Sequence, residues 1–117
     1  PGASIGLGMQ FAPARKLLDA GVCLAIASDW NPGSAPMGDL LTQAAVLATF
    51  QKLSIAEVLS ALTFRAAKAL GLTDRGTLEN GKTADFISFP TADFREIIYQ
   101  QGQLKPNAVW RKGERIV

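Results

Sequence analysis

The fold of this chain is decided by one stretch, Val22-Cys23-Leu24-Ala25-Ile26-Ala27-Ser28-Asp29-Trp30-Asn31-Pro32-Gly33-Ser34. Its apolar first part follows Gly21 and predicts a short buried strand over residues 22–27. Asp29 is the first charged group at the carboxyl end of that strand, and a Pro/Gly loop follows it directly. In α/β folds catalytic carboxylates occupy this place, although an acid there can equally well end a strand or cap a turn.

The composition limits the classes of protein to consider. Of the 117 residues, 48% are hydrophobic and 19% are charged, so we expect a soluble globular chain with a buried core. The net charge is +2 without a basic stripe, which argues against a nucleic-acid partner. No run approaches the ~20 apolar residues of a membrane span. We therefore expect no membrane contact and a cytoplasmic location.

The single cysteine bears on the cellular setting, and the first residues bear on whether the chain is part of a larger protein. Cys23 lies within the predicted strand, so we expect a small core residue in a reducing, intracellular setting. The sequence opens Pro-Gly-Ala-Ser-Ile-Gly-Leu-Gly over residues 1–8, without an initiator methionine. This opening predicts a loop entered midway, in a piece of a larger protein.

Three helices are predicted before residue 72. The first covers residues 14–20 and follows Pro13. The second is capped by Asp39 and continues to about Gln51. It is apolar on more than one side, so we expect it to be covered on more than one side, as in a larger assembly. The third begins with a Ser54/Glu57 capping box and continues to Leu70.

The remainder of the chain predicts turns and short strands. Residues 76–83 are rich in turn formers and contain the hairpin dipeptide Asn80-Gly81. Residues 84–89 predict a strand that Pro90 ends, and residues 94–99 suit either a short helix or a strand. The tail, residues 108–117, predicts two short strands around Lys112-Gly113.

Three motifs in this order resemble the carboxyl-terminal portion of the metal-dependent amidohydrolases. They are the predicted strand ending in Ser28-Asp29, the helix ending Ala66-Ala67-Lys68-Ala69-Leu70-Gly71-Leu72, and Gly76-Thr77-Leu78-Glu79-Asn80-Gly81-Lys82-Thr83-Ala84-Asp85-Phe86. The resemblance implies an α/β fold that is the carboxyl-terminal part of a (β/α)8 amidohydrolase barrel. Residues 1–72 would hold the last β/α units of the barrel and added helices. Residues 73–117 would return to the closing strands of a small β-sandwich-like domain.

The loop at residues 29–34 resembles one particular family among the amidohydrolases. Asp29-Trp30-Asn31-Pro32-Gly33-Ser34 is similar to the Asp-x-Asn-Pro-Gly-Ser of the imidazolonepropionase family. The resemblance implies hydrolytic opening of 4-imidazolone-5-propanoate to N-formimidoyl-L-glutamate, a step of histidine degradation. It assigns Asp29 as metal ligand and catalytic residue. It also assigns Asn31 and Gly33 to the formimidoylglutamate moiety of the substrate and Ser34 to the imidazolone ring.

The chemistry of these residues agrees with the implied roles. An ionised Asp29 can bind Zn²⁺ or iron and accept a proton from a metal-bound water. The Asn31 amide offers both donors and acceptors, and Gly33 lets a ligand approach the backbone closely. Ordinary turn chemistry accounts for Asn31, Gly33 and Ser34 equally well, so both interpretations stay open.

The sequence also departs from a complete metal site. It contains no histidine, and Arg15 and Tyr99 match none of the family's substrate-binding positions. We therefore expect the chain alone to hold neither zinc nor iron and to be inactive, with a small-molecule substrate and homo-oligomerisation in the whole enzyme. Two alternatives remain: another amidohydrolase, such as a deaminase or cyclic-amide hydrolase, or a non-catalytic, truncated barrel remnant that self-associates.

Overall fold

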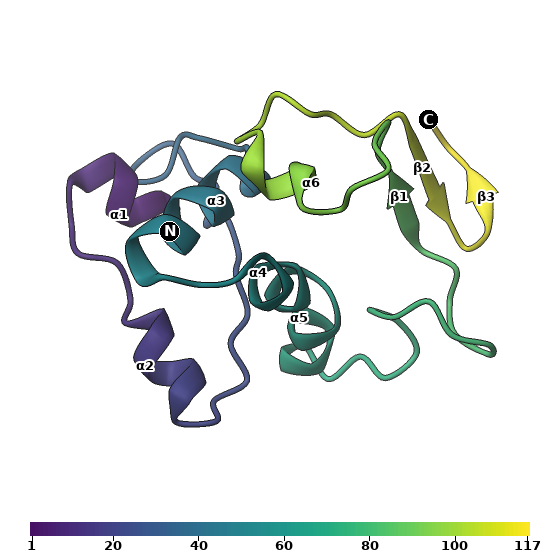
Figure 1. The fold of residues 1–117 in the computed structure, drawn as a ribbon, viewed down its shortest axis with the longest axis horizontal. Coiled ribbons are helices and arrows are strands. Elements are labelled where there is room, and N and C mark those ends of the chain that lie inside the picture. The colour runs from purple at the N-terminus through teal and green to yellow at the C-terminus, as the bar shows by residue number, and fades with distance from the viewer.

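The computed structural model describes residues 1–117. Helices make up the first part of the chain, and a small sheet lies beside them at the other end of the molecule (Figure 1). The helices are α1 (Gly2–Leu7), α2 (Ala14–Asp19), α3 (Leu40–Gln51), α4 (Ile55–Leu62), α5 (Phe64–Ala69) and α6 (Glu96–Tyr99). The strands are β1 (Phe86–Ser88), β2 (Ala108–Arg111) and β3 (Glu114–Arg115).

The core lies between α3, α4 and α6. Its buried side chains are Ile26, Ala44, Ala45, Leu47, Ala48, Val58, Ala61 and Ile98. The predicted second helix is thus covered on more than one side, because α4 and α6 both pack against α3. None of the helices has the length and apolar character needed to cross a membrane.

Side-chain caps fix where α3 and α4 begin. The Asp39 carboxylate accepts a hydrogen bond from the Thr42 amide at 3.0 Å. The Ser54 hydroxyl accepts from the Glu57 amide at 3.2 Å, and the Glu57 carboxylate accepts from the Ser54 amide at 2.8 Å. These bonds satisfy amide groups that have no partner inside a helix. The predicted helices at residues 14–20 and 39–51 and the predicted capping box are confirmed.

The single helix predicted from Ser54 to Leu70 is wrong, since it divides into α4 and α5 at Thr63. Thr63 has φ −121° and ψ −101°, far from helical values. Its hydroxyl donates to the Leu59 carbonyl at 2.7 Å. A hydroxyl bond to the carbonyl four residues earlier competes with the helix's own hydrogen bonds, so it favours the break.

The predicted buried strand over residues 22–27 is also wrong. The segment is without regular secondary structure, and the amide bonds it donates are Val22 to the Leu17 carbonyl and Ile26 to the Ala61 carbonyl. A strand needs a neighbouring strand, and β1, β2 and β3 pair only with one another. Cys23 is exposed as a result, so its predicted place in the core is wrong as well.

The predicted loop at residues 1–8 instead contains α1. Pro1 stands at its N-cap, and Gly8 ends it with φ 63°, donating its amide to the Ser4 carbonyl. Proline suits the start of a helix and glycine its left-handed end, so both signals were present in the sequence.

The sheet is antiparallel in the order β1-β2-β3. Phe86 pairs with Trp110, and their rings stack with centroids 4.6 Å apart. The two predicted tail strands and the strand within residues 84–89 are therefore confirmed. At Asn80-Gly81 the Lys82 amide donates to the Glu79 carbonyl, which makes a turn, but no strands flank it to form the predicted hairpin.

Candidate functional site

Asp29 begins a loop that continues to Gly38 and leads into α3; we call residues 29–38 the Asp29 loop. The residue has φ 53°, a left-handed conformation that aspartate tolerates better than most residues. Asp29 is exposed, and its carboxylate has no hydrogen-bond or ion-pair partner in the chain. This carboxylate is thus free to bind a cation or to accept a proton.

Asn31 holds the loop together. Its amide oxygen accepts from the Gly33 amide at 3.0 Å, the Ser34 amide at 2.9 Å and the Ser34 hydroxyl at 3.2 Å. Its amide nitrogen donates to the Asp29 carbonyl at 2.6 Å. The structure therefore brings all four predicted site residues together. It also leaves Asn31 only one free N–H for a ligand, because the loop uses its oxygen.

A backbone bridge narrows the loop behind these residues. Asn31 and Ala35 exchange amide–carbonyl bonds of 3.1 and 3.3 Å, and Ala35 is fully buried. The Ser34 hydroxyl donates to Asn31 and keeps its lone pairs for another donor. The loop thus combines a bonded backbone with an exposed carboxylate at Asp29.

Sequence reasoning assigned no role to Trp30. The Trp30 ring lies against Gly38, where an added Cβ would come within 3.0 Å of the indole atom Cε2. Trp30 is otherwise 73% exposed. A side chain at position 38 would displace the Trp30 ring. The glycine at position 38 was therefore the one sign in the sequence that a ring packs there.

Helix α1 supports the loop from behind, a contact that the sequence analysis missed. A Cβ on Gly2 would lie 2.3 Å from the Ser28 carbonyl oxygen, and a Cβ on Gly6 would lie 2.2 Å from the Ser34 carbonyl oxygen. Residues four apart share a helix face, so both glycines let α1 approach the loop backbone. The Gly2/Gly6 spacing was the available signal.

A metal site needs several ligating side chains close together. Nowhere in the structure do three or more His, Cys, Asp or Glu side chains gather in a way that could hold one. Asp29 fits one position of such a site, because its carboxylate is exposed and unpaired. A catalytic zinc site takes three protein ligands, so these 117 residues do not complete one.

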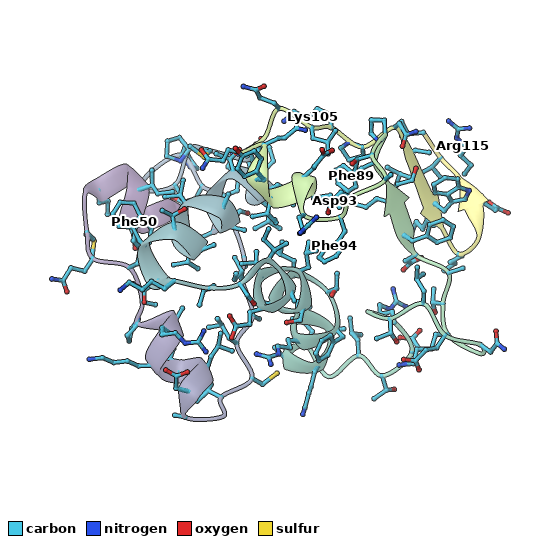
Figure 2. The ribbon with its side chains drawn as sticks, viewed as in Figure 1. Phe50, Phe89, Asp93, Phe94, Lys105 and Arg115 are labelled. Carbon is cyan, nitrogen blue, oxygen red and sulfur yellow. The ribbon has the colours of Figure 1, made fainter.

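Two cavities of the structure lie away from the Asp29 loop. The larger, of about 650 Å³, is lined by residues of the α1–α2 connection and the end of α3, including Phe50 (Figure 2). A smaller one, of about 240 Å³, lies at residues 77–84. Neither is lined by residues of the Asp29 loop.

Comparison with known proteins gives the Asp29 loop a context. A model of the amidohydrolase family matches residues 5–116. This chain belongs to the amidohydrolase family.

Relatives within the family include imidazolonepropionases. The chain is 40% identical to an imidazolonepropionase of Deinococcus deserti over 116 residues, covering 99% of this chain and 29% of the relative. It is 44% identical to an imidazolonepropionase of Deinococcus radiodurans over 102 residues, covering 87% of this chain and 26% of the relative. The chain thus spans less than a third of these relatives, and the resemblance drawn from the sequence is confirmed.

Two solved structures are similar to this chain in fold. An adenosine deaminase from Xanthomonas campestris with bound zinc is 29% identical, with a TM-score of 0.86, covering 98% of this chain and 30% of that chain. An atrazine chlorohydrolase from Arthrobacter aurescens, complexed with zinc, is 23% identical, with a TM-score of 0.79, covering 99% of this chain and 30% of that chain. The second similarity concerns the fold alone.

Proposed function

We propose that this chain is the carboxyl-terminal part of a metal-dependent hydrolase that opens 4-imidazolone-5-propanoate to N-formimidoyl-L-glutamate. The observation that carries the proposal is the Asp29 loop, in which an unpaired carboxylate stands two residues before an Asn-Pro-Gly-Ser turn. The imidazolonepropionase relatives, at 40% and 44% identity, support this substrate.

The proposal also places the chain in its fold. In the whole protein, residues 22–27 would pair as the last strand of a (β/α)8 barrel, whereas within these 117 residues they have no neighbouring strand and form none. Residues 1–72 supply the last β/α units and added helices, and residues 73–117 return to a small β-domain that contains the sheet. The remaining ligands and substrate contacts would come from outside these residues.

Asp29 has two roles in the proposed reaction. Its carboxylate would hold a zinc or iron ion at one position and would accept a proton from the attacking water, since no neighbouring side chain bonds to it. A bound zinc ion would supply that water with a pKa of roughly 7. In this proposal Asp29 therefore helps to activate the water that attacks the ring carbonyl of the substrate.

The turn residues bind and orient the substrate. The free N–H of Asn31 and the lone pairs of Ser34 face no partner in the loop and are available to the polar groups of an amidine or imidazolone. Gly33 has only the Asn31 amide oxygen within 3.3 Å of where a Cβ would lie, so a ligand can approach its backbone. Asn31 also fixes the loop that carries them.

The test uses a protein in which an upstream amidohydrolase barrel segment is joined to these residues. Asp29→Asn should lower kcat by about 10²–10⁴ because the proton acceptor is lost, with metal content falling in parallel. Asp19→Asn, at an exposed acid on α2, is the matched control and should keep full activity. A normal kcat with full metal in Asp29→Asn would show that Asp29 merely ends a segment.

Asn31 requires two variants because it has a loop role as well as a ligand role. Asn31→Ala should cost about 1–3 kcal/mol in kcat/KM while leaving the metal in place. Asn31→Asp keeps an oxygen for the Gly33 and Ser34 amides but loses the nitrogen that donates to Asp29. It should therefore keep the turn and still lose substrate affinity; equal kcat/KM in Asn31→Asp and the wild type would exclude Asn31 from substrate binding.

A deaminase is the second candidate, and the 29% identity to a zinc-containing adenosine deaminase favours it. A deaminase would release ammonia from an exocyclic amine, whereas the proposed enzyme opens a ring. Assay of the joined protein with 4-imidazolone-5-propanoate and with adenosine separates the two, because only one substrate should be consumed.

A further inference from the structure

Gln43 is the one polar side chain that is fully buried in this chain. It lies in the first half of α3, where the other buried residues are Ala44, Ala45, Leu47 and Ala48. An apolar side chain of similar length would fill this place without any polar atom to satisfy. A polar residue in such a core therefore needs an explanation from its contacts.

One end of the Gln43 amide is bonded to the Asp29 loop. Its Nε2 donates to the Met37 carbonyl at 2.6 Å. Met37 lies two residues before the Asp39 cap of α3, at the point where the loop becomes a helix. Gln43 thus fixes the direction in which the loop leaves.

The other end faces the beginning of the loop. Oε1 is buried and has no hydrogen-bond partner. It lies 3.0 Å from where a Cβ on Gly2 would be, and the Ser28 carbonyl oxygen lies 2.3 Å from the same point. Ala35, bridged to Asn31, is also there, with its Cβ at 2.8 Å. Gly2 of α1 therefore lies close to three groups at once: the Ser28 carbonyl, Ala35 and the Gln43 amide oxygen.

An unpaired buried acceptor lowers the stability of the fold, so the amide is not explained by stability. It is explained by position, since its Nε2 bonds to the end of the loop and its Oε1 lies beside Gly2, which packs against Ser28 at the start of the loop. Departures of this kind from core packing rules are expected where a functional group has to be held.

We infer that Gln43 is a positioning residue that sets the backbone of the Asp29 loop, through the Met37 carbonyl and through its packing with Gly2 behind Ser28. Its effect on the reaction rests on the proposed function above, because it acts through Asp29 and Asn31. The geometric part can be measured without any substrate.

The main variant is Gln43→Met, which keeps the length of the side chain and removes both polar ends. Leu47→Met, also buried on α3, is the matched control for a core change away from the loop. Trp30 reports on the loop because its ring lies on Gly38. Both variants are made in a Trp110→Phe background, so that Trp30 is the only tryptophan of these 117 residues, and the joined upstream segment carries none.

In the joined protein, Gln43→Met should raise the acrylamide quenching constant of Trp30 and speed hydrogen exchange at residues 29–38, whereas Leu47→Met should change neither. KM should rise and kcat/KM should fall by about 10- to 100-fold with metal content unchanged. Partial unfolding would lower the apparent kcat and leave KM in place, so the KM increase identifies positioning. Unchanged Trp30 quenching and loop exchange in Gln43→Met would overturn the inference.

A measurement on the wild-type protein guards against a variant that fails to fold. The side-chain amide protons of Gln43 should exchange far more slowly than those of exposed Gln103, and equal rates would overturn the inference. A wild-type protein that never opens the imidazolone ring would contradict the proposed function instead. The Trp30 and exchange comparisons would still decide the role of Gln43.

Discussion

The Asp29 loop and the sheet are held in place by different kinds of contact. The sheet is joined to the loop before it by hydrogen bonds and ion pairs of charged side chains, over separations of up to 27 residues. The Asp85 carboxylate accepts from Arg75 at 3.1 Å and from the Lys112 amide at 2.8 Å. Asp74 accepts from Arg75 and from the Thr83 hydroxyl. These bonds anchor both the start of β1 and the β2–β3 turn.

The Asp29 loop has its own internal turn, and its outside support comes from two helices, α1 well before it in the chain and α3 directly after it. Gly2 of α1 and Gln43 of α3 lie behind it, and Ile26 before it is bonded only to Ala61. The comparison teaches that local sequence determines the shape of the turn, whereas its orientation depends on elements that fold around it. Substitutions in the helices behind the loop should therefore alter the conformation of the Asp29 loop, whereas substitutions in the sheet should not.

The largest expected effect is self-association of the 117 residues alone. The amides of Cys23, Leu24, Ala25 and Ala27 have no backbone hydrogen-bond partner, and such groups are a template for pairing with another chain. Light scattering at micromolar concentration should report at least a dimer. Ala25→Pro removes an amide from this segment and should weaken association, whereas Ala92→Pro, in an exposed loop, should not. A stable monomer of the wild type would contradict the proposed strand.

A glycine substitution behind the loop should come next. Gly2→Ala should destabilise the fold by about 1–3 kcal/mol, because the new Cβ meets the Ser28 carbonyl, and it should also alter Trp30 emission. Gly113→Ala is the control in the sheet, where φ is 82° and the nearest atom to the Cβ is 3.9 Å away. Its cost should be about 1 kcal/mol without a change at Trp30. Denaturant unfolding and Trp30 emission measure the two effects. Equal changes in Trp30 emission in both variants would contradict the difference between loop and sheet.

The smallest expected effect concerns the contact that joins the two regions. Lys105, labelled in Figure 2, forms an ion pair of 2.9 Å with Asp39 at the start of α3. The Thr42 amide, and after it the Lys105 ammonium, lowers the pKa of Asp39 below its usual value. A lowered pKa in the folded state means that ionised Asp39 stabilises the fold above its ordinary pKa, and that this stability is lost as the pH falls through the lowered value.

Lys105→Met should therefore cost about 0–1 kcal/mol at pH 7. The difference from the wild type should disappear in acid, once Asp39 is protonated. Lys16→Met, at an exposed lysine of α2 without an ion pair, is the control. Urea unfolding at both pH values measures the effect, and a cost that persists unchanged in acid would exclude the ion pair as its source.

What could be predicted from the sequence follows the same division. The Asp39 cap, the Ser54/Glu57 capping box and the Lys112-Gly113 turn are local signals, and the structure contains all three. The turn chemistry of Asn31-Pro32-Gly33-Ser34 is also local, and its hydrogen bonds confirm it as a turn. The roles of its residues toward metal and substrate came from resemblance and stay predictions.

The rest depends on contacts that the sequence does not display. An apolar run at residues 22–27 becomes a strand only beside another strand, so its composition could not decide its state. Helix α1 has only six residues, too few to show a hydrophobic period, and the contact of Gly2 with Ser28 joins positions far apart in the chain. Gln43 is near Met37 in the sequence, but its burial depends on the packing of α3. Such tertiary contacts override local propensity.

Substrate contact by the Asp29 loop is tested most directly by hydrogen exchange in the metal-loaded, joined protein, with and without N-formimidoyl-L-glutamate. Binding of this product should slow exchange at residues 29–35, since their backbone would be covered. Exchange at the exposed turn of residues 79–82 should stay the same. Unchanged exchange throughout the Asp29 loop under conditions in which the product occupies and inhibits the enzyme would contradict the proposed site.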